Sequence, residues 1–172
     1  MMDLRALQAA AVANKVAKGL NTTDVPLEVA LLIGEVGEAF TAWRRGEPGF
    51  DLELADIFLF AVGLADMTGL DLHAEVNRTA PHWRQPADVS VPLQFGLLTR
   101  KTTDALTAWL ENQDVGRHLA SAYLFLAALA DMTGADLQDA VERKMRINQN
   151  RTYRRDARGV PIKVTTRIEP RT

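Results

Sequence analysis

The chain repeats itself, and this duplication constrains its fold more than any other feature of the sequence. Residues 25–46 align with 91–112 at an offset of 66 positions, and residues 58–76 align with 123–141 at an offset of 65. The strings VPL, TAW and LADMTG recur intact at matching places. Repetition of this kind indicates that one supersecondary unit occurs twice in the chain.

Each copy of the repeat has the start and stop signals of three helices. Thr23 or Asp24 can cap a long first helix, because both side chains accept hydrogen bonds from free backbone N–H groups. A second helix is expected to begin after Asp51, which can cap it, and to end at Gly69. Asp71 can then cap a short third helix. The sequence therefore predicts an all-α protein, a helical bundle built from two fused repeats related by a pseudo-two-fold axis.

The repeat divides the chain into four parts. We expect a first repeat over residues 1–79, a linker over 80–90, a degenerate second repeat over 91–153 and a basic, irregular tail over 154–172. From Glu142 onward there are ten Lys or Arg residues and three Asp or Glu residues. Such a tail can bind phosphates, nucleic acid or an acidic surface. Nucleic acid is the weakest of these interpretations, because the rest of the chain is acidic and no recognition motif accompanies the tail.

Composition excludes several classes of site. The chain has no cysteine, so thiolate metal sites, disulfides and a cysteine nucleophile are ruled out. The absence of cysteine fits a cytoplasmic location. The longest apolar runs, 57–65 and 122–130, have nine residues each and are too short to span a bilayer.

Two carboxylates lie within the most apolar segment of the chain. Glu53 and Asp56 are three residues apart in DLELADIFLFAVGLAD, so they fall about 60° apart on one side of a helix. A helix that is apolar all round is normally buried. An ionised carboxylate in such a place is strongly destabilising unless a charged partner or a metal compensates it.

A second pair with the same spacing precedes the first. Glu35 and Glu38 lie at the edge of the apolar arc of the preceding helix, and helices joined by a short loop pack against each other in a bundle. The four carboxylates can therefore converge in a shared metal site. An all-oxygen ligand set favours Mg²⁺ or Mn²⁺ over zinc, and Mg²⁺ often shares its coordination with substrate phosphates. The arrangement suggests phosphate chemistry.

The second copy of the repeat serves as an internal comparison. Its apolar frame is retained, but the positions that align with the four carboxylates hold Lys101, Asp104, His118 and Ser121. Ordinary surface residues would have no reason to differ as a group, whereas a metal site needs to be kept in one copy only. This pattern places the function in the first half.

The carboxylates and the end of the second copy together resemble a known family. The segments G-E-V-G-E-A-F (34–40) and E-L-A-D-I (53–57) resemble the E-x-x-E and E-x-x-D signature of the MazG-like all-α NTP pyrophosphohydrolases, which are relatives of the dimeric dUTPases. The stretch K-M-R-I-N-Q-N-R-T-Y (144–153) resembles the end of that domain. N-K-V-A-K-G-L-N (14–21) is a looser match to its first helix.

The resemblance implies Mg²⁺-dependent hydrolysis of a nucleoside triphosphate to the monophosphate and pyrophosphate. It assigns the metal to the four carboxylates, Glu35, Glu38, Glu53 and Asp56. It assigns contacts with phosphates or sugar to basic and amide side chains, Lys144, Asn148, Arg151 and, more weakly, Lys18. It covers residues 1–79 well and residues 91–153 as a degenerate copy.

Two expectations follow about how the site is assembled. The counterpart of Lys144 in the first copy is Thr79, so we expect one composite site with carboxylates from copy one and cations from copy two. The chain then corresponds to a fused, asymmetric dimer, which acts as a pseudo-dimeric monomer or dimerises further. Many relatives carry an additional Glu where this chain has Gly34. Either one of the four carboxylates serves as the general base, with Glu38 our choice, or water activated by the metal needs none.

Other interpretations remain open at this level. A dUTPase- or dCTPase-type specificity and a house-cleaning activity on non-canonical nucleotides predict the same residues. Phe40, Trp43 and Trp109 could stack on a base, although aromatic residues at helical spacing usually belong to the core. A catalytically inactive helical module that binds a nucleotide or a partner and regulates it is a different class of function.

Overall fold

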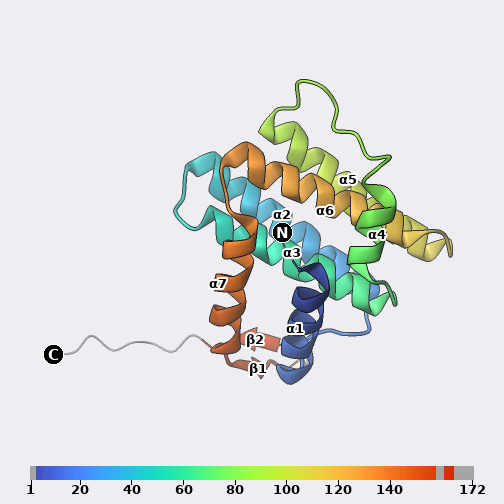
Figure 1. Ribbon diagram of the computed structural model, residues 1–172. Helices are drawn as coiled ribbons and strands as arrows, with labels where there is room; N and C mark the ends of the chain where they lie inside the picture. The colour runs from blue at the N-terminus through green and yellow to red at the C-terminus, as the bar shows by residue number, and fades with distance from the viewer. Residues whose placement is uncertain (1–2, 158–160, 165–172) are drawn as a thin grey trace.

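The computed structural model describes residues 3–157 and 161–164. Within these residues the chain forms seven α-helices and one pair of short strands (Figure 1). The predicted fold class, an all-α helical bundle, is confirmed. None of the described helices is both long and apolar enough to cross a membrane.

The first half contains four helices: α1 (Leu4–Ala17), α2 (Val25–Arg45), α3 (Phe50–Met67) and α4 (Leu72–Thr79). Asp24 and Asp71 cap α2 and α4, each accepting a backbone N–H bond. The expected cap of α3 is wrong. Gly49 precedes that helix with a left-handed φ of 90°, and Asp51 lies inside the first turn, where its carboxylate pairs with Arg143.

The second half contains three helices in the same order as α2, α3 and α4: α5 (Val91–Leu110), α6 (Val115–Thr133) and α7 (Leu137–Gln149). In each half the two long helices pack against each other, α2 on α3 and α5 on α6. The short helix of each half packs on the other half, because α4 lies against α6 and α7 lies against α3 (Figure 1). This exchange brings the end of the second repeat to the carboxylate-bearing helices of the first.

The core follows from the apolar character of α3. Leu54, Phe58 and Val62 are fully buried, as the absence of a polar face in this helix predicts. Phe40 and Trp43 of α2 pack with an aromatic residue of α5, the ring centroids of Phe40 and Phe95 lying 5.4 Å apart. These aromatic residues therefore belong to the contact between the two halves.

The start of the basic tail is more regular than predicted. β1 (Tyr153–Arg155) pairs antiparallel with β2 (Pro161–Lys163). The expectation of an irregular segment from residue 154 is therefore wrong for these strands, and residues 158–160 and 165–172 of the tail lie outside the described residues. The Arg155 guanidinium donates to the carbonyl oxygen of Gly19 at 2.9 Å, so the ribbon is joined to the end of α1.

Candidate functional site

Three carboxylates from two helices meet where α2 packs on α3. Glu35, Glu38 and Glu53 each offer an oxygen, and these oxygens lie within 4.8 Å of one another. Opposite ligands of an octahedral Mg²⁺ ion are about 4.2 Å apart, twice the usual metal–oxygen distance. Small side-chain adjustments would therefore let all three oxygens bind one ion. In the described part of the chain, this is the one place where three or more His, Cys, Asp or Glu side chains bring potential ligand atoms so close together.

Asp56, the fourth predicted ligand, lies beside this group but has a cation of its own. Its carboxylate forms an ion pair with the ammonium of Lys144 on α7. The Lys144 side chain is buried and that of Asp56 is mostly buried. Two residues that the sequence assigned to metal and to substrate are thus paired with each other. Whether Asp56 also binds the metal stays a prediction.

The carboxylate group has more negative charge than its surroundings compensate. Burial, and then the charges of Asp56, Glu38 and Glu53, raise the pKa of Glu35 to about 7. Burial is also the largest cause that raises the pKa of Glu53 and of Asp56. Lys144 acts against all three shifts without cancelling them. An added divalent cation would remove this repulsion, so the residues present fit a metal site.

The end of α7 brings a second cation and an amide to the same place. The positive charge of Arg151 lowers the pKa values of Glu53 and Asp56, so its guanidinium acts on both carboxylates. Arg151 also donates to Oδ1 of Asn148 at 2.7 Å. The structure therefore brings the predicted carboxylates together with Lys144, Asn148 and Arg151 across the junction of the two repeats.

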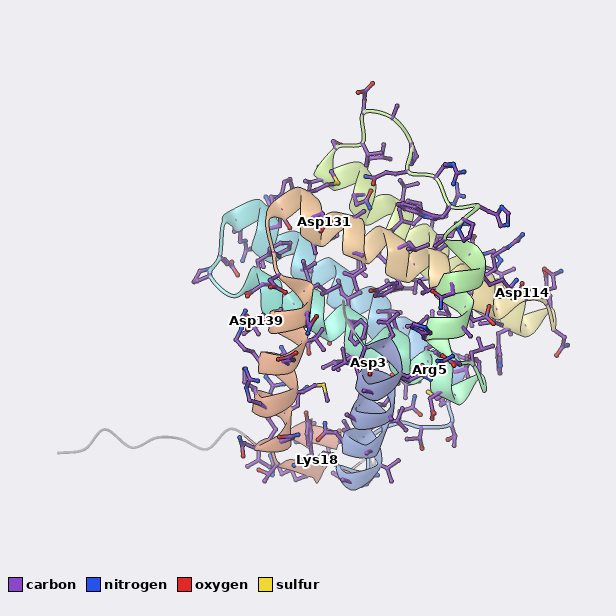
Figure 2. All side chains as sticks on the ribbon, in the orientation of Figure 1. Asp3, Arg5, Lys18, Asp114, Asp131 and Asp139 are labelled. Carbon is purple, nitrogen blue, oxygen red and sulfur yellow. The ribbon has the colours of Figure 1, made fainter. Side chains whose placement is uncertain are left out.

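Lys18 has a structural role that the sequence did not predict. Figure 2 shows it at the end of α1, near the ribbon. Its ammonium donates to the backbone carbonyl oxygens of Gln149 and Arg151, each at 2.8 Å. Lys18 therefore joins α1 to the segment that carries Arg151, and its contact with substrate stays a prediction.

An open hollow borders the carboxylates on the side of α2. Its volume is about 360 Å³. It combines two glycines with acidic and small side chains, and its lining residues are Gly34, Gly37, Glu38, Thr41, Ala42, Glu47 and Glu53. A ligand that enters this hollow meets the backbone of α2 and two of the three converging carboxylates.

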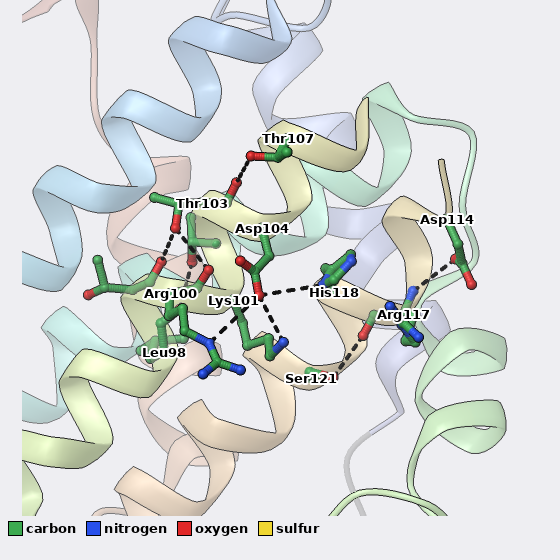
Figure 3. A network of polar contacts seen from close by, with 12 residues as sticks. Leu98, Arg100, Lys101, Thr103, Asp104, Thr107, Asp114, Arg117, His118 and Ser121 are labelled. Atoms are coloured by element: carbon green, nitrogen blue, oxygen red, sulfur yellow. Dashed lines mark hydrogen bonds and ion pairs between the residues drawn. The ribbon is translucent and has the colours of Figure 1, made fainter. Parts of the chain in front are cut away.

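The equivalent place in the second half holds a different network (Figure 3). Lys101 donates to Asp104 at 2.8 Å, and this bond is the largest cause that lowers the pKa of Asp104. Burial lowers the pKa of His118, which favours its neutral form. Ser121 donates to the backbone oxygen of Arg117 at 2.8 Å. One carboxylate next to Lys101 and Arg100 thus stands in the second half where the first half has its group of carboxylates.

Sequence reasoning missed a buried ion pair between α1 and α2. Lys15 pairs with Glu28, whose side chain is 1 % exposed. Asn21 donates to the other oxygen of Glu28 at 3.1 Å, and the Lys15 ammonium lies 5.9 Å from the centre of the Phe60 ring. The sequence held one signal of this pair, because Glu28 aligns with Gln94 and both copies therefore have a polar residue at this position. In the structure both side chains are buried.

Comparisons with models of protein families, with curated proteins and with solved structures found no match to this chain. The interpretation of the site therefore depends on its own geometry and on the residues that the sequence brings together.

The raised pKa values predict how the metal-free protein responds to pH. The folded state keeps a proton on Glu35 up to about pH 7, whereas the unfolded chain releases it near pH 4.5. Between these values the folded state holds more of this proton than the unfolded chain does, so the contribution of Glu35 to stability falls as pH rises from about 4.5 to about 7. We expect the melting temperature of Glu35→Gln in EDTA, relative to wild type, to increase between pH 5 and pH 7.5, as measured by circular dichroism. A constant difference would contradict this.

Proposed function

We propose that this chain is a Mg²⁺-dependent nucleoside triphosphate pyrophosphohydrolase, which converts a nucleoside or deoxynucleoside triphosphate and water to the monophosphate and pyrophosphate. The observation that carries the proposal is the meeting of three carboxylates with Lys144 and Arg151 at the junction of the two repeats. A cluster of acids alone would suggest a cation site. Acids combined with cations from a second element suit a ligand that is itself a metal-bound anion.

The metal would be held by Glu35, Glu38 and Glu53, whose oxygens already lie within 4.8 Å of one another. Their hard oxygen atoms suit Mg²⁺ or Mn²⁺. When bound, such an ion neutralises charge on the phosphates and acts as a Lewis acid toward the α–β phosphoanhydride.

Residues of α7 and of the segment that directly follows it would act on the leaving group. Lys144 and Arg151 would bind the oxygens of the departing pyrophosphate, where negative charge develops during cleavage. Asp56 holds the Lys144 ammonium in place through its ion pair. Asn148 holds the Arg151 guanidinium through its hydrogen bond. Both cations are therefore oriented before substrate binds.

Glu38 is our candidate for the group that accepts a proton from the attacking water. It is exposed and lines the hollow, whereas Glu35 and Glu53 are partly buried. Gly34 supplies no further carboxylate at the position before Glu35. One of the converging carboxylates must therefore serve both purposes, unless activation by the metal suffices.

A direct test is to measure pyrophosphate release from a panel of canonical and modified nucleoside triphosphates with Mg²⁺, Mn²⁺ or EDTA. We expect metal-dependent formation of monophosphate and pyrophosphate, and the panel would separate a dUTP- or dCTP-type preference from activity on non-canonical nucleotides. Release of inorganic phosphate together with a nucleoside diphosphate would contradict cleavage of the α–β phosphoanhydride. Absence of any release, together with a nucleotide-dependent rise in melting temperature, would favour an inactive binding module.

A further inference from the structure

Two glycines in the middle of α2 have no explanation in the packing of the protein. Gly34 and Gly37 lie well inside a helix that runs from Val25 to Arg45. Glycine in a helix interior is destabilising relative to alanine, because more backbone entropy is lost on folding. A Cβ atom added at either position would meet no atom of a neighbouring element within 4 Å. The fold alone would therefore be more stable with alanine at both places.

Both glycines line the hollow beside the carboxylates. Each directly precedes a carboxylate of the group, Gly34 before Glu35 and Gly37 before Glu38. The backbone of α2 is therefore bare where the carboxylates open to solvent. The lining of the hollow includes Glu47 as a third acid and no Lys or Arg.

The second half shows that this helix accepts side chains at the same positions. Gly34 and Gly37 align with Arg100 and Thr103 of α5. Thr103 is exposed, and its hydroxyl donates to a backbone oxygen of its own helix. At these two positions glycine thus occurs in the half that has the carboxylates and is replaced by larger residues in the half that lost them. This difference connects the glycines with the ligand of the site and not with the architecture of the helix.

We infer that Gly34 and Gly37 are positioning residues that leave room for a polyphosphate, complexed with a divalent cation, to lie against the backbone of α2. The inference rests on the proposed function and adds to it the face from which substrate is bound. The acidic lining of the hollow would repel a free polyphosphate, so the ligand enters as its metal complex. Added methyl groups would stabilise the helix while they obstruct that ligand.

The test compares Gly34→Ala and Gly37→Ala with a matched control, Gly96→Ala. Gly96 is also exposed inside a long helix, and a Cβ added there would likewise meet nothing within 4 Å. All three variants should melt about 2–4 °C above wild type. Gly34→Ala and Gly37→Ala should each raise KM for the preferred nucleotide at least tenfold, whereas Gly96→Ala should leave KM unchanged. Affinity for Mn²⁺ alone should be equal in all of them.

The outcomes separate this inference from the proposed function. Hydrolysis by wild type with the same KM in all three variants would overturn the inference and leave the function standing. Reduced Mn²⁺ affinity in Gly34→Ala or Gly37→Ala would also overturn it, because the methyl group would then disturb the carboxylates. If wild type hydrolyses no nucleotide, calorimetric titration with magnesium pyrophosphate decides. Weaker binding to Gly37→Ala than to Gly96→Ala supports the inference, and equal or absent binding overturns it.

Discussion

Replacing Glu53 with glutamine is expected to lower the rate of pyrophosphate release at least about 100-fold, because loss of groups that only orient a metal's ligands already lowers activity 10–100-fold. Glutamine keeps the shape of the side chain and removes the charge that would bind the metal. Burial raises the pKa of Glu53, so the uncharged side chain should fold at least as well. The measurement is steady-state kinetics with saturating Mg²⁺, together with the melting temperature in EDTA.

The repeat offers a matched control for this variant. His118 occupies the equivalent position on α6, and its Nδ1 atom is buried without a hydrogen-bond partner. His118→Gln should leave kcat within about twofold of wild type, because His118 lies in the second half and outside the group of converging carboxylates. An equal loss in both variants, or a wild-type rate in Glu53→Gln, would place the chemistry elsewhere.

Replacing Lys15 with methionine is expected to destabilise the fold by about 3–5 kcal/mol, because it leaves the buried carboxylate of Glu28 without its cation. The Glu28 side chain is 1 % exposed and that of Lys15 is 12 % exposed, so water cannot take over the role of the ammonium. The neutral amide of Asn21 would be the remaining partner of this carboxylate that the structure identifies. Urea denaturation, followed by circular dichroism, measures the change in the free energy of unfolding.

The double variant Lys15→Met/Glu28→Met is the control for that prediction. Replacing both members of a buried ion pair by apolar side chains of similar size is often neutral or stabilising. The double variant should therefore recover most of the stability lost in Lys15→Met. A double variant less stable than the single one would show that packing of the aliphatic chains, and not the buried charge, dominates at this position.

The carboxylates were predictable because the relevant geometry is local. The spacing of Glu35 and Glu38 on one helix, and of Glu53 on the next, follows from the period of an α-helix and from a short connecting loop. The duplication added information about residues that are far apart in the sequence. It predicted that the cations come from the end of the other copy, and α7 does lie against α3.

The pairings between charged residues were not predictable in the same way. Asp56 and Lys144 were assigned separately to metal and to phosphate, yet they form an ion pair with each other. Lys18 was assigned to substrate, and the structure shows that it donates to the backbone oxygens of Gln149 and Arg151. Nothing in the sequence around Lys18 indicates which carbonyl groups the other helix will present. These contacts depend on where two distant helices cross.

The sequence by itself determined the helices, their order in two repeats and the residues that could form a site, because each of these depends on side chains within a few turns of one another. Only the tertiary structure decided that the short helix of each half packs on the opposite half. That exchange pairs Asp56 with Lys144. Within the first half, the packing of α1 on α3 buries Lys15 against Glu28 of α2. The physical reason is that a buried charge is destabilising unless an opposite charge lies beside it. Which charges lie beside each other depends on how all the helices pack, and the sequence around one residue does not show this.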